Sequence, residues 1–192
     1  MKPKIVAVGG TVTPASATEL ALRYALRPAE EAGADVRVFG GEYLCTLPHY
    51  RGAGHSPADG SELVEAVRQA DGVLIAAPGY HGTVSGLVKN ALDYLEDLAA
   101  DERPYLDGRA VGLIACASGD QAAMGTVQTL RSIVHALRGW PTPMAATLRT
   151  YHGMFSPEGE CLDDRVRSQL RLVGEQVVHG ARSFASKVRD EE

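Results

Sequence analysis

Apolar runs without polar and apolar alternation recur along the chain, and they constrain its fold more than any other feature. Four runs are short and rich in Val, Ile, Leu and Ala, and a fifth candidate follows them; they cover residues 5–8, 36–39, 72–76, 111–115 and 144–148. Short apolar runs of this kind are typical of strands that are buried on both faces. The sequence therefore predicts a sheet in the interior of the molecule.

Helical patterns separate these runs. They cover residues 16–33, 61–70, 85–99, 125–137 and 163–188. A regular alternation of strand and helix favours a parallel sheet with helices on both faces and right-handed connections. We therefore expect an α/β protein, a three-layer sandwich with a five-stranded parallel sheet. In such a sandwich, ligands bind beyond the carboxyl ends of the strands, near the point where strand order reverses.

Length and charge narrow the classes of protein further. The 192 residues fit a single domain over residues 1–192, and the net charge of -5 argues against nucleic-acid binding, which needs a basic stripe. The first apolar run stops at Gly9, too early for a signal peptide or a membrane span, so we expect a cytoplasmic protein. The three cysteines stand far apart without metal-ligand spacing, and we expect no metal site.

Three polar, glycine-bearing loops are expected at the ligand edge of the sheet. The first follows residues 5–8 and holds Gly9, Gly10 and several hydroxyl residues, with Ser16 or Thr18 placed to cap the next helix. Backbone N–H groups at such a helix start suit a phosphate. The loop lacks GxGxxG and a Walker lysine, so neither a dinucleotide fingerprint nor a nucleoside triphosphate site is supported.

The second loop contains Pro78 and Gly79, which are expected to end a strand, and then Tyr80, His81 and Gly82. Gly82 lets the backbone approach a flat group, and Ser85 is placed to cap the following helix. The third loop holds Ser118, Gly119, Asp120 and Gln121. Taken alone, the first loop is more typical of an ordinary capped helix start, and the third is typical of an ordinary turn. Together they match the layout of a mononucleotide site, with the ring between the second and third loops.

The stretch "APGYHGTVSGLVKNALDYLEDL", residues 77–98, resembles the ring loop and following helix of the NADPH-dependent FMN reductases, a family of flavodoxin-like fold that includes flavin, quinone, azo-dye and chromate reductases. The shared pattern is a Pro-x-Tyr-x-Gly turn before a Gly-x-x-Lys-Asn-Ala-x-Asp helix. "LPHY" at residues 47–50, "RPYLDGRAVGLI" at 103–114 and "LRGWPTP" at 137–143 extend the likeness from Lys4 to about Tyr151.

The resemblance implies one flavodoxin-like FMN-binding domain, with phosphate on the first loop and the ring between the other two. The implied cofactor-binding residues are Thr11, Thr13, Ser16, Ala17, Thr18, Pro78, Gly79, Tyr80, His81, Gly82, Ser118, Gly119 and Asp120. It also implies a homodimer or homotetramer. We expect the helix after the ring loop to carry Tyr94, Leu95 and Leu98 at the interface; the alternative is a wide buried stripe.

One departure from the family pattern stands in the first loop. Relatives with this type of loop read like Gly-Gly-Thr-x-Arg-Pro-Gly-Ser-Ser-Thr, whereas this chain has Thr13, Ala15 and Ala17 in place of the Arg, the third Gly and the second Ser. An Arg on a phosphate is a strong, often bidentate contact. We therefore hypothesise that FMN is held loosely, as an exchanging substrate or with help from an oligomer partner, and that Arg51 is a candidate replacement cation.

The implied activity is that of a NAD(P)H-dependent FMN reductase, with hydride transfer from NADPH to FMN and onward to free flavin, a quinone or an azo compound. Such chemistry belongs to the two cofactors, so no catalytic side chain is expected, and preference for NADPH comes from the resemblance alone. The long loop at residues 42–57, with His49, Tyr50, Arg51 and His55, is a candidate cover for the nicotinamide site. Two other readings stay open: a non-enzymatic electron carrier of flavodoxin type, and a scaffold that has lost its flavin.

Overall fold

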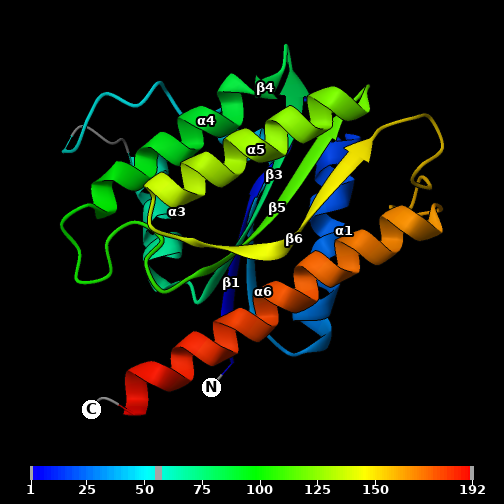
Figure 1. The fold of residues 1–192 in the computed structure, drawn as a ribbon. Helices are drawn as coiled ribbons and strands as arrows, with labels where there is room; N and C mark the ends of the chain where they lie inside the picture. The colour runs from blue at the N-terminus through cyan, green and yellow to red at the C-terminus, as the bar shows by residue number, and fades with distance from the viewer. Residues whose placement is uncertain (1, 55–57, 191–192) are drawn as a thin grey trace.

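The computed structural model, which describes residues 2–54 and 58–190, has a parallel sheet of five strands in the order β2-β1-β3-β5-β6 (Figure 1). A two-residue strand, β4, pairs antiparallel with the end of β3. The strands are β1 (Lys4–Gly9), β2 (Asp35–Phe39), β3 (Gly72–Tyr80), β4 (Thr83–Val84), β5 (Ala110–Ala117) and β6 (Trp140–Arg149). The expected five-stranded parallel sheet is confirmed. Strand order reverses between β1 and β3, which makes that position the switch point.

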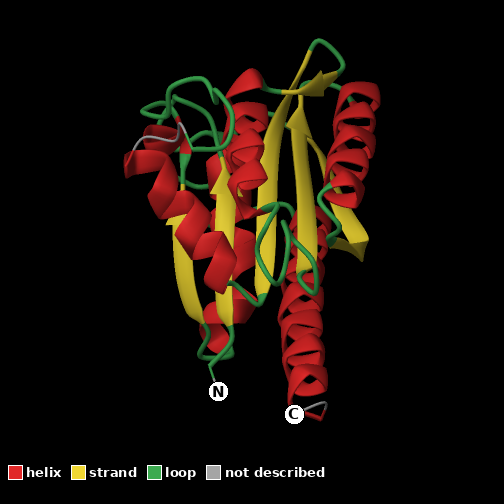
Figure 2. Cartoon of the chain, turned by 90° about the vertical axis from the view of Figure 1, so that its left-hand side faces the viewer, coloured by secondary structure: helices red, strands yellow, loops and turns green. Residues whose placement is uncertain are grey.

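Helices cover both faces of this sheet, as Figures 1 and 2 show. They are α1 (Ala17–Glu31), α2 (Gly41–Leu44), α3 (Ala58–Gln69), α4 (Gly86–Asp93), α5 (Asp120–Ala136) and α6 (Asp164–Asp190), with the 3₁₀ helix η1 (Tyr94–Leu98) continuing α4. α1 and α6 pack on one face, and the remaining helices pack on the other. The three-layer sandwich predicted from the sequence is therefore confirmed.

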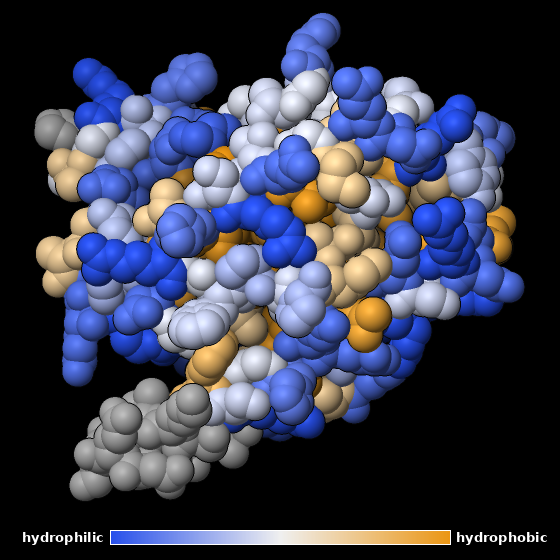
Figure 3. Space-filling view, in the orientation of Figure 1, coloured by the Kyte–Doolittle hydropathy of each residue, from blue (hydrophilic) through white to orange (hydrophobic). Residues whose placement is uncertain are grey.

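The strands differ in burial according to their place in the sheet. Every residue of β5 is buried, and β3 is buried from Gly72 to Pro78. β2, however, is an edge strand on which Asp35 and Arg37 are exposed, so the expectation of a strand buried on both faces is wrong there. β6 is the other edge, where Pro141 and Pro143 are tolerated because one side of the strand has no ladder partner. In Figure 3 apolar surface follows this edge between α5 and α6.

The side chains expected at an oligomer interface lie inside the chain. Tyr94 and Leu98 are fully buried and Leu95 is 2% exposed, all within the core under α3, α4 and α5. The wide buried stripe, the alternative to an interface, is therefore what these three residues form. Among the described residues, no helix is long and apolar enough to cross a membrane.

The long loop at residues 42–57 is partly helical, since α2 begins at Gly41. Residues 55–57, including His55, lie outside the described residues. Of the rest, residues 47–50 are held on α4. Asn90 accepts a hydrogen bond from the Tyr50 amide (2.9 Å) and donates to the carbonyls of Pro48 (3.0 Å) and Leu47 (3.4 Å). The asparagine of the Lys-Asn-Ala-x-Asp pattern thus anchors the "LPHY" segment.

Candidate functional site

The three loops singled out from the sequence leave the same edge of the sheet. Parallel register pairs Gly9 with Ala76 and Pro78 with Cys116, so β1, β3 and β5 reach their carboxyl ends together. Since neighbouring strands lie about 4.8 Å apart, the loops that follow them are adjacent. Figure 1 shows these loops at one end of the molecule.

The β1–α1 loop starts with two glycines in the left-handed region, at φ 148° for Gly9 and 120° for Gly10. A Cβ at Gly9 would lie 2.0 Å from the carbonyl oxygen of Ala76, so only glycine lets β1 turn here against β3. Further on, the Thr11 hydroxyl accepts a hydrogen bond from the Thr13 amide (3.2 Å). Thr13 is exposed and Thr11 is half-buried, so both threonines are accessible from solvent.

Ser16 caps α1, since its hydroxyl accepts a hydrogen bond from the amide of Glu19 at 3.3 Å. The remaining amides of the first turn have no intrahelical partner, and the 15-residue helix adds a partial positive charge at this end. Half-buried Ala17 can offer only its backbone to a ligand here. The loop and the helix start together have the donors that a phosphate needs.

Thr18 faces the interior instead of the loop. It is 3% exposed, and its side chain interacts with the Cys116 thiol. Burial raises the pKa of Cys116 to about 12, and the contact with Thr18 offsets part of that rise. This thiol is therefore protonated at neutral pH.

β3 does not end at Pro78 and Gly79 as expected. It continues to Tyr80, turns at His81 (φ 50°) and Gly82 (φ 89°), and returns as β4. Two positive φ angles in a two-residue connection define a type I′ hairpin. Pro78 is accommodated because β1 ends opposite Ala76, which leaves one side of β3 without a ladder partner beyond that point.

The hairpin rests on α5. A Cβ at Gly125 would lie 3.1 Å from the Gly82 carbonyl oxygen, and the hydroxyls of Thr83 and Thr129 lie 3.2 Å apart. Gly79 lies equally close to α5, since a Cβ there would be 2.6 Å from the Thr126 hydroxyl. These contacts fix the hairpin at the edge of the sheet, with Pro78 buried and Tyr80, His81 and Gly82 exposed.

The third loop consists of Ser118 and Gly119, and α5 begins directly at Asp120. Gly119 occupies the N-cap position, where no side chain caps the helix, so the first amides of α5 face out of the fold. Added Cβ atoms at Gly119 and Gly82 would meet no atom within 4 Å. The space over both backbones is open on the ligand side, which fits a flat ring such as that of FMN.

Exposed apolar side chains surround this edge, a feature that sequence reasoning missed except at Tyr80. Val12, Tyr80, Met124 and Tyr151 are 65%, 53%, 50% and 53% exposed. Met124 precedes Gly125 on α5, and Tyr151 follows β6, with its hydroxyl donating to Asp163 (2.9 Å). No sequence pattern reveals their exposure. Among the described residues, no group of three or more His, Cys, Asp or Glu side chains could hold a metal.

Comparison with known proteins identifies the family of this chain. Residues 3–153 match the model of a family described as NADPH-dependent FMN reductase. An FMN-dependent NADPH-azoreductase from Staphylococcus aureus (strain USA300) is 37% identical over 119 residues, which are 61% of this chain and 60% of that relative. The match therefore spans less than two thirds of the relative's length.

Two solved structures share the fold. FerB, a flavoenzyme NAD(P)H:(acceptor) oxidoreductase from Paracoccus denitrificans, has a TM-score of 0.73 at 18% identity and covers 92% of this chain and 98% of its own. A flavodoxin from the domain Archaea has a TM-score of 0.62 at 8% identity and covers 92% and 99%. The expected flavodoxin-like fold is thereby confirmed.

Proposed function

Because this chain belongs to the NADPH-dependent FMN reductase family, we propose that it is a NAD(P)H-dependent FMN oxidoreductase that passes electrons to a small-molecule acceptor. One observation carries the proposal. The exposed His81–Gly82 hairpin turn and the uncapped start of α5 adjoin the glycine-rich β1–α1 loop at a single edge of the sheet. This arrangement offers phosphate donors at one end and open backbone for a flat ring at the other.

Each loop has its own task in this proposal. The β1–α1 loop and the start of α1 would bind the phosphate through Thr11, Thr13, Ser16 and backbone amides, whereas buried Thr18 faces Cys116 and takes no direct part. The hairpin turn at His81 and Gly82 would contact one face of the ring. The amides around Ser118–Asp120 would donate to the polar edge of a bound ring and stabilise negative charge there.

Bound FMN would supply acceptance and release of hydride, while the protein orients the two reactants and excludes water between them. We assign no general acid or base. The exposed apolar side chains of Tyr80 and Met124 lie where a nicotinamide or an acceptor would enter. Free flavin, a quinone and an azo compound are the acceptor classes we propose, the last because the named Staphylococcus relative is an azoreductase.

An anaerobic mixing experiment tests this function against an electron carrier and a scaffold. Purified protein is mixed with FMN and NADPH, and bleaching of the oxidised flavin band is followed against a protein-free control. Fast protein-dependent bleaching is the expected result. Bound flavin without bleaching would indicate a carrier of flavodoxin type, and no flavin binding would indicate a scaffold.

We further propose that the protein is cytoplasmic and forms a homodimer or homotetramer. Symmetric assemblies are the commonest among oligomers. Because Tyr94, Leu95 and Leu98 are inside the core, any interface must use other side chains. Sedimentation velocity at two concentrations should give a species of two or four chains, and a monomer at both would contradict this proposal.

A further inference from the structure

The predicted phosphate loop lacks the family's arginine, since residue 13 is threonine. The structure places another arginine side chain, Arg23, near this loop. The loop forms one wall of a cleft of about 680 Å³. The other walls come from α1, the end of β2, and the segment that includes α2. Its lining includes Thr11, Glu19, Arg23, Glu42 and Tyr43.

Two Gly-Gly pairs allow the β1–α1 loop to pack closely against the segment that follows β2. β1 ends in Gly9-Gly10 and β2 is followed by Gly40-Gly41, and the parallel register, with Val8 opposite Phe39, places the pairs side by side. A Cβ at Gly41 would lie 1.8 Å from the carbonyl oxygen of Thr11, and one at Gly10 would lie 2.9 Å from the Gly41 nitrogen. The β1–α1 loop therefore has a fixed position relative to the cleft.

Arg23 is the positively charged side chain among the described residues that line this cleft. Its Nε and one terminal nitrogen donate to the same carboxylate oxygen of Glu19, at 3.1 and 2.9 Å. Side chains on a helix lean toward its N-terminus, which brings the guanidinium level with Glu19. A phosphate at the start of α1 would lie about one helical turn, 5.4 Å, from there.

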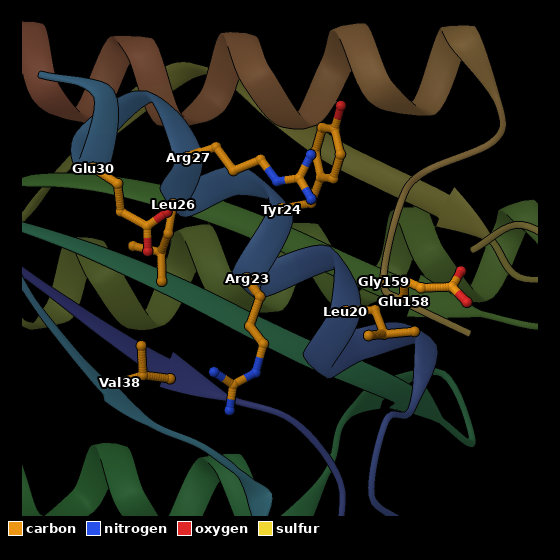
Figure 4. Close-up of a pocket in the computed structure, with 9 residues that line it drawn as sticks. All are labelled: Leu20, Arg23, Tyr24, Leu26, Arg27, Glu30, Val38, Glu158 and Gly159. Atoms are coloured by element: carbon orange, nitrogen blue, oxygen red, sulfur yellow. The ribbon is translucent and has the colours of Figure 1, made fainter. Parts of the chain in front are cut away.

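The hydrogen bonds to Glu19 leave the Arg23 guanidinium free to bind a phosphate instead. The Arg23 side chain is 58% exposed and that of Glu19 is 16% exposed, and ion pairs at i and i+4 on a helix are generally weak. Figure 4 shows a neighbouring pocket that Arg23 also lines, together with Tyr24 and Arg27. Arg27, by contrast, donates hydrogen bonds to both carboxylate oxygens of Glu160. A phosphate offers Arg23 a bidentate partner, whereas Glu19 offers only one carboxylate oxygen.

We propose that Arg23 supplies the positive charge for the FMN phosphate that position 13 no longer carries, and that Glu19 holds the guanidinium when no phosphate is bound. This inference rests on the proposed flavin-binding function. It replaces Arg51 as the compensating cation. Arg51 follows Tyr50, whose amide is anchored on α4, and it does not line the cleft.

The test compares equilibrium binding of FMN and of riboflavin, which has the same ring without phosphate, by fluorescence titration. For R23A we expect FMN affinity to fall by about 10- to 100-fold, the range of a lost charge-assisted contact, with riboflavin affinity unchanged. R23K should recover part of the loss. E19Q should bind FMN more tightly than the wild type, because a negative charge near the phosphate is removed and Arg23 is released.

R51A is the matched control and should bind both ligands as the wild type does. Equal losses for FMN and riboflavin in R23A would overturn the inference, as would a loss in R51A without one in R23A. Equal affinities of the wild type for FMN and riboflavin would also overturn the inference, but they would leave the proposed flavin-binding function intact. Absence of binding to either ligand in the wild type would remove the proposed function and this inference with it.

Discussion

At the scale of single residues, the hairpin tip places His81 in a backbone conformation that most side chains avoid. Its φ is 50°, and among non-glycine residues Asn, Asp and His are the ones found there most often. The side chain is exposed and stands beside the open backbone of Gly82. A residue that accepts such a conformation and points outward is a candidate for contact with a substrate, not for support of the fold.

We predict that H81A changes substrate affinity more than the rate of flavin reduction. Loss of one neutral hydrogen bond should raise the NADPH or acceptor KM by about 2- to 10-fold, because the imidazole contacts what binds over the ring. Steady-state and single-turnover kinetics separate the two effects. H81G, which suits the positive φ, controls for the turn itself. A collapse of the single-turnover rate with intact binding would show that His81 acts in the reduction step.

Gly79 and Gly86 form a matched pair for stability. G79A should lower the free energy of unfolding by about 1–3 kcal/mol, because its Cβ would lie 2.6 Å from the Thr126 hydroxyl in a packed contact. G86A should stay within about 0.5 kcal/mol of the wild type, since a Cβ there meets no atom within 4 Å. Urea denaturation measures both. Equal effects would mean that the hairpin does not need its close contact with α5.

At the scale of elements, the α4 helix holds the "LPHY" segment through Asn90. An aspartate at this position could still accept from the Tyr50 amide but could not donate to the carbonyls of Leu47 and Pro48. N90D should therefore cost about 1–3 kcal/mol of stability. K89Q, which removes only the exposed pair with Asp93, should cost less than about 1 kcal/mol. Similar losses in the two variants would argue against the anchor.

Elements were predictable from the sequence where hydrophobic pattern decides them and unpredictable where a tertiary contact decides. All five parallel strands fall on the predicted runs, but the hairpin was hidden because Pro78 and Gly79 are ordinary strand breakers. Likewise α5 was expected from Gly125 onward, whereas it begins at Asp120. Gly125 lies inside that helix because Gly82 approaches it, and a contact 43 positions away leaves no local pattern.

At the scale of the whole molecule, the candidate site was predictable as far as chain topology brings residues together. The sequence placed three loops at one edge because carboxyl ends of parallel strands share an edge. It could not show that Thr18 faces Cys116, or that Arg23 shares a cleft with the first loop. Those facts depend on side-chain direction and on the contact between the two Gly-Gly pairs, which only the packed fold determines.

Two ion pairs join α1 to the C-terminal part of the chain and predict how stability responds to acid. Arg171 of α6 holds both carboxylate oxygens of Glu31 at 2.9 Å, and Arg27 holds those of Glu160 before α6. These guanidinium contacts hold the pKa of Glu31 and of Glu160 below the ordinary value for a glutamate. Each carboxylate therefore stabilises the fold above the unfolded-state pKa, and the contribution disappears as pH falls through the lower folded-state pKa.

The double variant E31Q/E160Q should be less stable than the wild type at pH 7, and the gap should close as pH falls below about 4.5. Both carboxyls are exposed, so added salt should narrow the gap at pH 7 as well. Urea denaturation at pH 7, 5 and 3.5, at low and high salt, measures it. E158Q removes a charge from the same loop without touching either pair and should follow the wild-type curve. A gap that stays constant with pH would show that the two glutamates act through packing instead of charge.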